Sequence, residues 1–316
     1  KMMPPESRIV YSEHAQDILA ATVALIHSGQ PCALVTSLAI EGGAAREVGS
    51  LAVVAQSGVM TGYLSNGCID RDIMLHGLNA IRNGQIKHIR YGAGSPYMDL
   101  KLPCGGALEL IINPAPKLEV LSGALEALRA RAMTVMSFAA DPELILDGGG
   151  ALRFQYAPKP ALVLAGRGPI LRSTATLAEG MGFELHVASP DVDDIACLSD
   201  LNPKSTHRMT TPDVSLELPM DAHTAVLLLF HDHEWEHNLL MSAANAQPFF
   251  IGALGSRKTH EVRLRRLLEA GLSAELCSKI QGPIGLVPSL RNASLIAVSS
   301  LAEVTSKLPS AQVRLS

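Results

Sequence analysis

Along the first part of the chain, hydrophobic positions follow two different spacings. Between Ser12 and Gly29 they recur every three to four residues, which predicts an amphipathic helix that Ser12 caps and Gly29 ends. Apolar runs predict strands over Cys32–Ile40, Leu51–Ala55, Ile86–Tyr91 and Ala107–Ile112, and a second helix is predicted over Ile69–Asn83. Together these elements predict a small α+β domain.

From Ala161 onward, apolar runs of strand length alternate with helical stretches. The predicted strands are Ala161–Ala165, Phe183–Ser189, Ala225–Phe230 and Phe249–Gly255, and the predicted helices are Ile170–Glu179, Trp235–Ala246 and Arg257–Ala270. Apolar strands separated by helices are typical of a parallel sheet with helices on both faces. We therefore expect an α/β protein with an N-terminal α+β domain (residues 1–115), a bridging segment (residues 116–160) that contains one helix, Leu118–Arg131, and short strands, and a Rossmann-like C-terminal domain (residues 161–316).

Composition narrows the class of protein. Of the 316 residues, 47% are hydrophobic and 18% are charged, which is enough apolar material for folded domains. Acidic residues outnumber basic ones by 30 to 26 and aromatic residues make up 4%, and both values disfavour a nucleic-acid binder. The N-terminal residues lack the apolar core of a signal peptide, and the apolar runs are strand-sized, so we expect a cytoplasmic protein outside any membrane.

The cysteines are candidates for chemistry rather than for disulfides. Their number is odd, five, and no CxxC pair is present, which disfavours a disulfide framework and a structural zinc site. Cys68 follows a Ser65-Asn-Gly67 turn and precedes a helix, where the helix dipole favours the thiolate. Cys104 begins a second glycine-rich turn, Cys104-Gly105-Gly106. The two turns suggest one ligand-binding surface, and the alternative is that each cysteine is a small buried apolar residue.

A glycine turn follows the first strand of the Rossmann-like half. Gly166 and Gly168 allow the close backbone approach that a phosphate at a helix N-terminus needs. The sixth position of the nucleotide-binding pattern is Leu171 rather than Gly or Ala, and Ser189 ends the second strand where a ribose-binding carboxylate is usual, with the nearest acid at Asp191. The pattern therefore favours either a phosphate-bearing ligand without nicotinamide or a Rossmann fold with no nucleotide.

Polar residues also follow the next two apolar strands. His231, Asp232, His233, Glu236 and His237 come after Ala225–Phe230, so we consider a metal site and, in preference, a ligand contact by His231. Gly255, Ser256 and Arg257 then open a basic helix. This start predicts an anion pocket, with a capped helix and a solvated basic face as the alternative.

Several motifs, in order, resemble those of one family. They are Arg46-x-x-Gly49, Gly62–Asp70, Tyr91-Gly92 with Asp99 and Cys104-Gly105-Gly106, Leu162–Gly168, Leu229–Asp232, Ile251–Arg257 (IGALGSR) and Pro283–Leu286 (PIGL). This set resembles the XdhC/CoxI family, accessory proteins that mature molybdenum hydroxylases such as xanthine dehydrogenase. Departures from its pattern include Asn66 for glycine, Asp70 for glutamate, Arg167 for histidine and Ser189 for aspartate.

The resemblance implies a chaperone rather than an enzyme. Its cargo would be the molybdenum cofactor, a molybdopterin with the cytosine dinucleotide as an alternative form. The chaperone would protect it while a cysteine desulfurase supplies sulfur, and would insert it into an apo-enzyme of the xanthine dehydrogenase or aldehyde oxidoreductase type. A cofactor-modifying transferase and a second copy of the chain are further candidate partners.

The resemblance and the turns above together assign the cofactor-binding residues. They are Arg46, Ser65, Gly67, Cys68, Cys104, Gly105, Gly106, Gly166, Gly168, His231, Gly255, Ser256 and Arg257, with Cys68 and Cys104 as candidate molybdenum contacts. Two other functions stay open: an NAD(P)-dependent oxidoreductase, which Ser189 disfavours, and a protein-interaction adaptor that binds no ligand.

Overall fold

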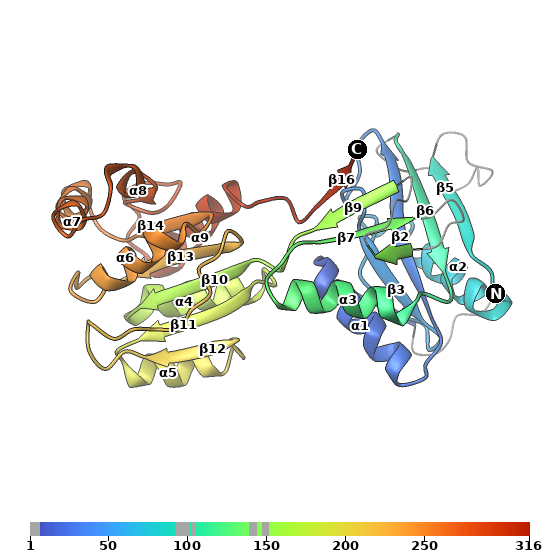
Figure 1. Cartoon of the computed structure of the whole chain (residues 1–316), viewed down its shortest axis with the longest axis horizontal. Helices are drawn as coiled ribbons and strands as arrows, with labels where there is room; N and C mark the ends of the chain where they lie inside the picture. The colour runs from blue at the N-terminus through green and yellow to red at the C-terminus, as the bar shows by residue number, and fades with distance from the viewer. Residues whose placement is uncertain (1–6, 93–101, 103–104, 139–143, 147–151) are drawn as a thin grey trace. The chain divides into compact units, whose positions relative to one another are not determined.

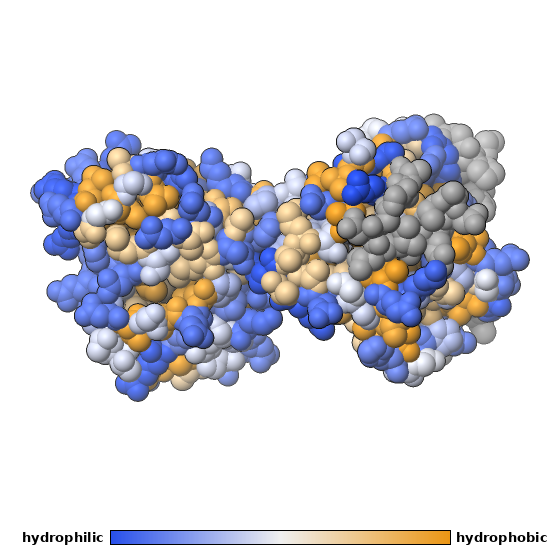
Figure 2. Space-filling model, in the orientation of Figure 1, coloured by the Kyte–Doolittle hydropathy of each residue, from blue (hydrophilic) through white to orange (hydrophobic). Residues whose placement is uncertain are grey.

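The computed structural model describes residues 7–92, 102, 105–138, 144–146 and 152–316, and its contacts divide the chain into two units (Figure 1). Unit 1 comprises Lys1–Lys159 and Ser310–Ser316, and unit 2 comprises Pro160–Pro309. No helix among the described residues is long and apolar enough to cross a membrane. On the face in Figure 2, hydrophilic residues surround the apolar groups in both units.

Unit 1 is built on a mixed sheet with the strand order β1-β4-β3-β2-β6-β5. These strands are β1 Arg8–Val10, β4 Val59–Thr61, β3 Leu51–Ala55, β2 Cys32–Glu41, β6 Ala107–Asn113 and β5 Lys87–Gly92. In β2, Leu34 packs into a core with helices α1 (Ala15–His27) and α3 (Leu118–Arg129), whereas Ala33 packs into a second core with helix α2 (Asp70–Asn83). Both faces of the sheet are buried, which explains why the central strand β3 is apolar at every position.

A smaller antiparallel sheet completes unit 1. Its order is β16-β9-β7-β8, formed by Gln312–Leu315, Leu152–Tyr156, Thr134–Phe138 and Leu144–Leu146. Phe138 and Phe154 of this sheet enter the same core as α1 and α3. Residues 116–159 of the predicted bridging segment therefore belong to unit 1 rather than bridging two domains, and residues 310–316 return to unit 1 instead of ending the Rossmann-like domain.

Unit 2 is a parallel sheet with the order β12-β11-β10-β13-β14-β15. Its strands are β12 Ser205–Arg208, β11 Glu184–Ser189, β10 Ala161–Gly166, β13 Thr224–Leu229, β14 Phe250–Ala253 and β15 Ile280–Gln281. One face is covered by helices α4 (Gly168–Glu179), α5 (Val192–Ser199) and α9 (Ala293–Ser306), and the other by α6 (His237–Ala246), α7 (Arg257–Glu269) and α8 (Ala274–Ser278). The predicted Rossmann-like fold is confirmed.

Candidate functional site

The turn before α2 is held by one buried carboxylate. Asp70, fully buried, accepts hydrogen bonds from the backbone amides of Leu64 (2.7 Å), Ser65 (3.1 Å) and Gly67 (3.2 Å). Its other contact is the Ser65 hydroxyl, at 2.6 Å. Because Asp70 also begins α2, the helix dipole adds to these contacts in stabilising the charge. The predicted residues Ser65 and Gly67 thus belong to a rigid turn rather than a flexible one.

This turn presents Cys68 to a pocket. The thiol is exposed, and the pocket has a volume of about 580 Å³. Its walls come from three segments: residues 43–45, the turn itself with Tyr63, and Leu102 with Leu108. We call it the Cys68 pocket.

Arg46 supports the wall of the Cys68 pocket rather than lining it. The guanidinium donates to the carbonyl oxygens of Glu13 (2.5 Å) and Tyr63 (3.5 Å), and it lies 4.7 Å from the centroid of the Tyr63 ring. The Tyr63 hydroxyl donates to the Glu13 carboxylate at 2.7 Å. Burial and this hydrogen bond to Glu13 raise the pKa of Tyr63, so the phenol keeps its proton.

At the glycines after Cys104, backbone segments pass close to one another. A Cβ atom on Gly106 would lie 2.2 Å from the Glu41 carbonyl oxygen, and one on Gly92 would lie 2.0 Å from the Gly106 carbonyl oxygen. Gly105 is exposed and donates its amide to the Leu102 carbonyl oxygen at 2.9 Å. Cys104 itself lies outside the described residues. Gly106 therefore acts through packing, and the predicted molybdenum contact of Cys104 stays a prediction.

In unit 2, the other predicted residues come together at one edge of the sheet. Strand β10 pairs with β13, which pairs with β14, and all run in the same direction. Gly166 and Gly168, His231, and Gly255 to Arg257 follow these three strands, so they share the carboxyl edge where α/β folds bind ligands. A Cβ atom on Gly166 would lie 2.5 Å from the Leu229 carbonyl oxygen, which explains the glycine at that position.

The glycine turn after β10 is hydrogen-bonded to a carboxylate of the protein itself. The Gly168 amide donates to the Asp194 carboxylate at 2.7 Å, and Arg172 Nε lies 2.5 Å from the other oxygen of that group. Asp194 is buried, and Arg167 provides no side-chain cap for α4. A carboxylate from α5 thus occupies the position at which a Rossmann fold usually holds phosphate. This arrangement disfavours a dinucleotide at the turn.

The nearest acid after β11 caps a helix instead of facing a ribose. Asp191 accepts from the amides of Asp193 (2.8 Å) and Asp194 (3.1 Å) at the start of α5. These two backbone hydrogen bonds lower the pKa of Asp191. Near the same carboxyl edge of the sheet, the guanidinium of Arg167 lies 5.9 Å from the ring centroid of Trp235.

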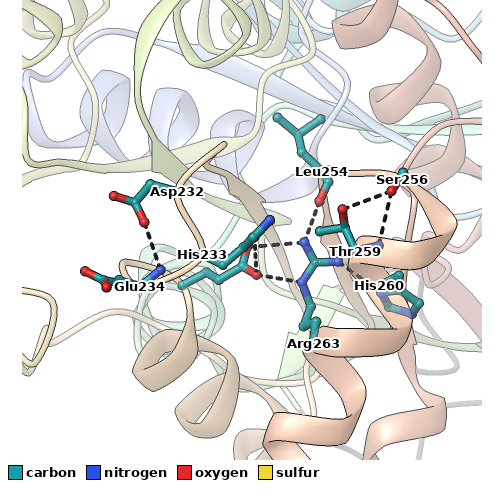
Figure 3. A network of polar contacts seen from close by, with 9 residues as sticks. Asp232, His233, Glu234, Leu254, Ser256, Thr259, His260 and Arg263 are labelled. Carbon is teal, nitrogen blue, oxygen red and sulfur yellow. Dashed lines mark hydrogen bonds and ion pairs between the residues drawn. The ribbon is translucent and has the colours of Figure 1, made fainter.

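A second pocket lies between α6 and α7 and is backed by a buried ion pair. Arg263 Nε donates to Glu236 at 2.7 Å, and Arg263 Nη2 donates to the Leu254 carbonyl oxygen at 2.5 Å (Figure 3). His233 Nδ1 lies 3.0 Å from the same carboxylate, and Arg263 Nη1 donates to His260 Nδ1 at 3.0 Å. Burial and the Arg263 charge lower the pKa of His260.

This pocket, which we call the α6–α7 pocket, has a volume of about 370 Å³. Ser256, one of its lining residues, caps α7 by accepting from the Thr259 amide at 3.1 Å. His231 and Arg257 are exposed at the same edge but do not line the pocket. Among the residues that the structure describes, no three His, Cys, Asp or Glu side chains group to hold a metal ion, and this finding argues against the metal site considered at residues 231–237.

Three residues that organise these sites were not among the sequence candidates: the carboxylates of Asp70 and Asp194, and Arg263. The signal for Arg263 was available, because it lies seven residues after Ser256 on the face of α7 that points inward. Asp194 gave no such signal, since its partner Gly168 lies 26 residues away in the chain.

Two family models match the chain. Residues 25–92 match the model described as the XdhC and CoxI family, and residues 162–304 match that of the XdhC Rossmann domain. Between them lies most of the smaller sheet of unit 1, which neither model covers.

Known proteins align with half or more of the chain. The molybdenum cofactor insertion chaperone PaoD of Escherichia coli is 33% identical over 96% of this chain and 91% of its own length. The uncharacterized protein YqeB of Escherichia coli is 26% identical over 50% of this chain and 30% of its own length. A crystal structure described as a xanthine dehydrogenase from Bacillus halodurans has the same fold, with a TM-score of 0.73 and 19% identity over 91% of this chain and 94% of that chain.

Proposed function

Because the chain belongs to the XdhC and CoxI family, we propose that it carries the molybdenum cofactor and inserts it into an apo-enzyme. The proposal is supported by the similarity to PaoD along nearly the whole length of both chains. In this role the chain is an accessory protein, and the cofactor is its cargo.

The observation that carries the proposal is the Cys68 pocket. A thiol is a soft ligand of the kind that suits a metal already bound by sulfur. Here it is exposed, it sits beside a turn that Asp70 holds rigid, and it faces a volume of about 580 Å³. That volume lies in the range of roughly 300–1,000 Å³ found for small-molecule sites. The described residues therefore fit the metal end of such a cargo.

The chemistry of this chain's residues in that pocket is binding and protection. Tyr63 remains protonated, so this side chain places no negative charge against an anionic cargo. Arg46 holds Tyr63 in place through its carbonyl oxygen and ring.

Finer features of the role are also part of the proposal. The recipient would be of the xanthine dehydrogenase or aldehyde oxidoreductase type, and a cysteine desulfurase would supply sulfur while the cofactor is held. The cargo would be molybdopterin or its cytosine dinucleotide form, supplied in the second case by a transferase. We propose that these events take place in the cytoplasm, with a homodimer as the carrying species.

Two matched cysteine variants test the proposal. The full chain and its variants would be incubated without oxygen with isolated molybdenum cofactor, passed through gel filtration, and assayed for molybdenum and for the fluorescent oxidised pterin. We expect comparable amounts of metal and pterin on the wild-type chain and on Cys197→Ala, an exposed thiol of unit 2, and loss of both on Cys68→Ala. Retention of molybdenum and pterin by Cys68→Ala would show that this thiol is not needed to hold the cofactor.

A wild-type chain that is folded and reduced but retains neither metal nor pterin would contradict the proposal as a whole. The adaptor function would then be preferred, and it predicts that docking to the partner enzyme survives Cys68→Ala. The oxidoreductase function is disfavoured in any case because Asp194 holds the Gly168 amide.

A further inference from the structure

The α6–α7 pocket combines positive charge with an apolar wall. Lys258 and Arg266 lie on its rim, and neither has an ion-pair partner among the residues that the structure describes. Both line this pocket, but eight residues of helix separate them by about 12 Å along the axis, so Lys258 lies at the N-terminal end of α7 and Arg266 about two turns further on. Leu240 of α6 and Val262 of α7 line the pocket between the two helices.

Hydroxyl groups lie near Lys258, at the N-terminal end of α7. Ser256 Oγ lies 2.9 Å from Thr259 Oγ1, and both residues line the pocket. Helix α7 has no acidic residue in its first turn, so its N-terminal dipole is not offset there. Cations, hydroxyl groups and a helix N-terminus in one pocket form an environment that a phosphate group satisfies.

The acids at the pocket do not cancel this charge. Glu236 is buried and its carboxylate is paired with Arg263, which also bonds the Leu254 carbonyl oxygen. Glu234 is exposed at the rim, and its single negative charge is outnumbered by the positive charges of Lys258 and Arg266. The Glu236–Arg263 pair ties α6 to α7 and to the end of β14, so the shape of the pocket is formed before any ligand arrives.

The glycine turn of β10 offers a contrast within the same sheet. There the Gly168 amide is taken by the Asp194 carboxylate, so a phosphate would meet a negative charge. At α7 the corresponding position is lined by Lys258 and the hydroxyls of Ser256 and Thr259. The phosphate-binding capacity of this Rossmann fold is therefore found at the β14–α7 turn.

We propose that the α6–α7 pocket binds a mononucleotide-type ligand, with its phosphate group against Ser256 and Lys258, its ring against Leu240 and Val262, and a polar group of its sugar or base against Arg266. The volume of about 370 Å³ is at the small end of the range of roughly 300–1,000 Å³ for ligand pockets, which suits a mononucleotide. This site is independent of the proposed cofactor carrying at Cys68, because it is built from other residues and its ligand contains no metal.

The chain contains its own reporter for this site. Its single tryptophan, Trp235, lies between the lining residues Glu234 and Glu236. Adenosine 5′-monophosphate, cytidine 5′-monophosphate and inorganic phosphate would each be titrated into the full chain, with Trp235 fluorescence and calorimetry as readouts. We expect saturable binding of at least one nucleotide, with a lower dissociation constant than that of inorganic phosphate.

Three substitutions on one helix test the assignment. Lys258→Ala and Arg266→Ala each remove a charge-assisted contact and should raise the dissociation constant of the nucleotide roughly tenfold or more. Arg265→Ala removes an exposed cation of the same helix that does not line the pocket, and it should leave the constant unchanged. All three side chains are exposed, so thermal unfolding should be unaffected.

The proposal is overturned if none of the three probes binds saturably, or if Lys258→Ala and Arg266→Ala bind the nucleotide as tightly as the wild-type chain. Inorganic phosphate bound as tightly as the nucleotides would overturn the role of Leu240 and Val262. Cys68→Ala should bind nucleotide normally. A failure here therefore leaves cofactor carrying intact, and a failure of cofactor retention leaves nucleotide binding intact.

Discussion

The carboxylate of Asp70 and the hydroxyl of Ser65 lie 2.6 Å apart, and both side chains are buried. The Ser65 hydroxyl also accepts the amide of Ile69 at 3.2 Å, so the two residues close the turn from both ends. Cys68 lies between them in the chain but remains exposed. Two buried polar residues thus fix the backbone on either side of one accessible thiol.

Asp70→Asn tests how much this turn depends on the carboxylate. An amide side chain has one acceptor oxygen in place of two, so at least one backbone amide of the turn loses its partner. We expect the free energy of unfolding to fall by about 1–3 kcal/mol. Chemical denaturation measures the change, and Asp200→Asn, the same substitution at an exposed position, should be near neutral. Equal stability of both variants would refute a structural role for Asp70.

The imidazole of His14 makes the stability of unit 1 depend on pH. His14 Nδ1 accepts the Gln16 amide at the start of α1, and burial, with smaller contributions from Lys159 and Arg46, lowers its pKa to about 4. The folded state therefore binds this proton less readily than the unfolded state. Its contribution is complete above the ordinary pKa of about 6.5 and is lost as the pH falls toward 4. The loss should approach about 3 kcal/mol.

His14→Asn supplies the control for that prediction. Asparagine can cap α1 in the same way but does not titrate. Urea unfolding of both proteins between pH 7.5 and pH 4.5 should show a steeper decline for the wild-type chain than for the variant. Parallel curves would show that His14 is not the responsible group.

Gly105 and Gly106 should respond differently to alanine. The added methyl group on Gly106 would meet the Glu41 carbonyl oxygen at 2.2 Å, so β6 and the 41–43 loop must separate. We expect a loss of about 3 kcal/mol or more in the free energy of unfolding. Gly105 has a φ of +69° and no atom within 4 Å of the added methyl, so Gly105→Ala should cost about 1 kcal/mol, from the backbone alone. Thermal unfolding compares the two, and a larger loss for Gly105→Ala would contradict the packing argument.

Glu236→Gln leaves the Arg263 charge buried without its counter-ion. Both side chains are buried, and breaking such a pair costs about 3–5 kcal/mol. We expect a loss of this size in denaturant unfolding, whereas Glu234→Gln at the exposed neighbouring rim should change stability little. A neutral Glu236→Gln would indicate that the hydrogen bonds of Arg263 to Leu254 and His260 suffice to hold α7.

The sequence predicts the elements of unit 2 well where they depend on neighbouring residues in the chain. The run Ala161–Ala165 becomes β10 because a strand covered on both faces must be apolar at every position, and this leaves a recognisable pattern. Helix α5 and strand β12 were not predicted. Residues of β12, such as Ser205 and His207, are polar because this strand is at the edge of the sheet, where one side is open.

In unit 1, long-range strand pairing explains why the observed domain bounds differ from the predicted ones. Strand β9 has partners on both sides, and one of them, β16, is separated from it by the whole of unit 2. No local spacing can report such a contact, so residues 116–160 resembled a linker. For the sites, the turns of Cys68 and Gly255 follow from their glycine and capping residues. The anchors Asp194 and Glu236 depend on hydrogen bonds to residues 26 and 27 positions away, which spacing does not report, whereas the contacts of Asp70 are local.

The pairing of β16 with β9 has a consequence for synthesis. A ribosome releases the residues of unit 2 before it releases Ser310–Ser316, so the parallel sheet can form while β9 still has one unpaired side. During that interval Phe154 and Tyr156 lie on a strand with an open edge, which is the kind of surface that attracts other nascent chains. Residues that emerge after unit 2 close this edge, and thus complete the domain that was begun first.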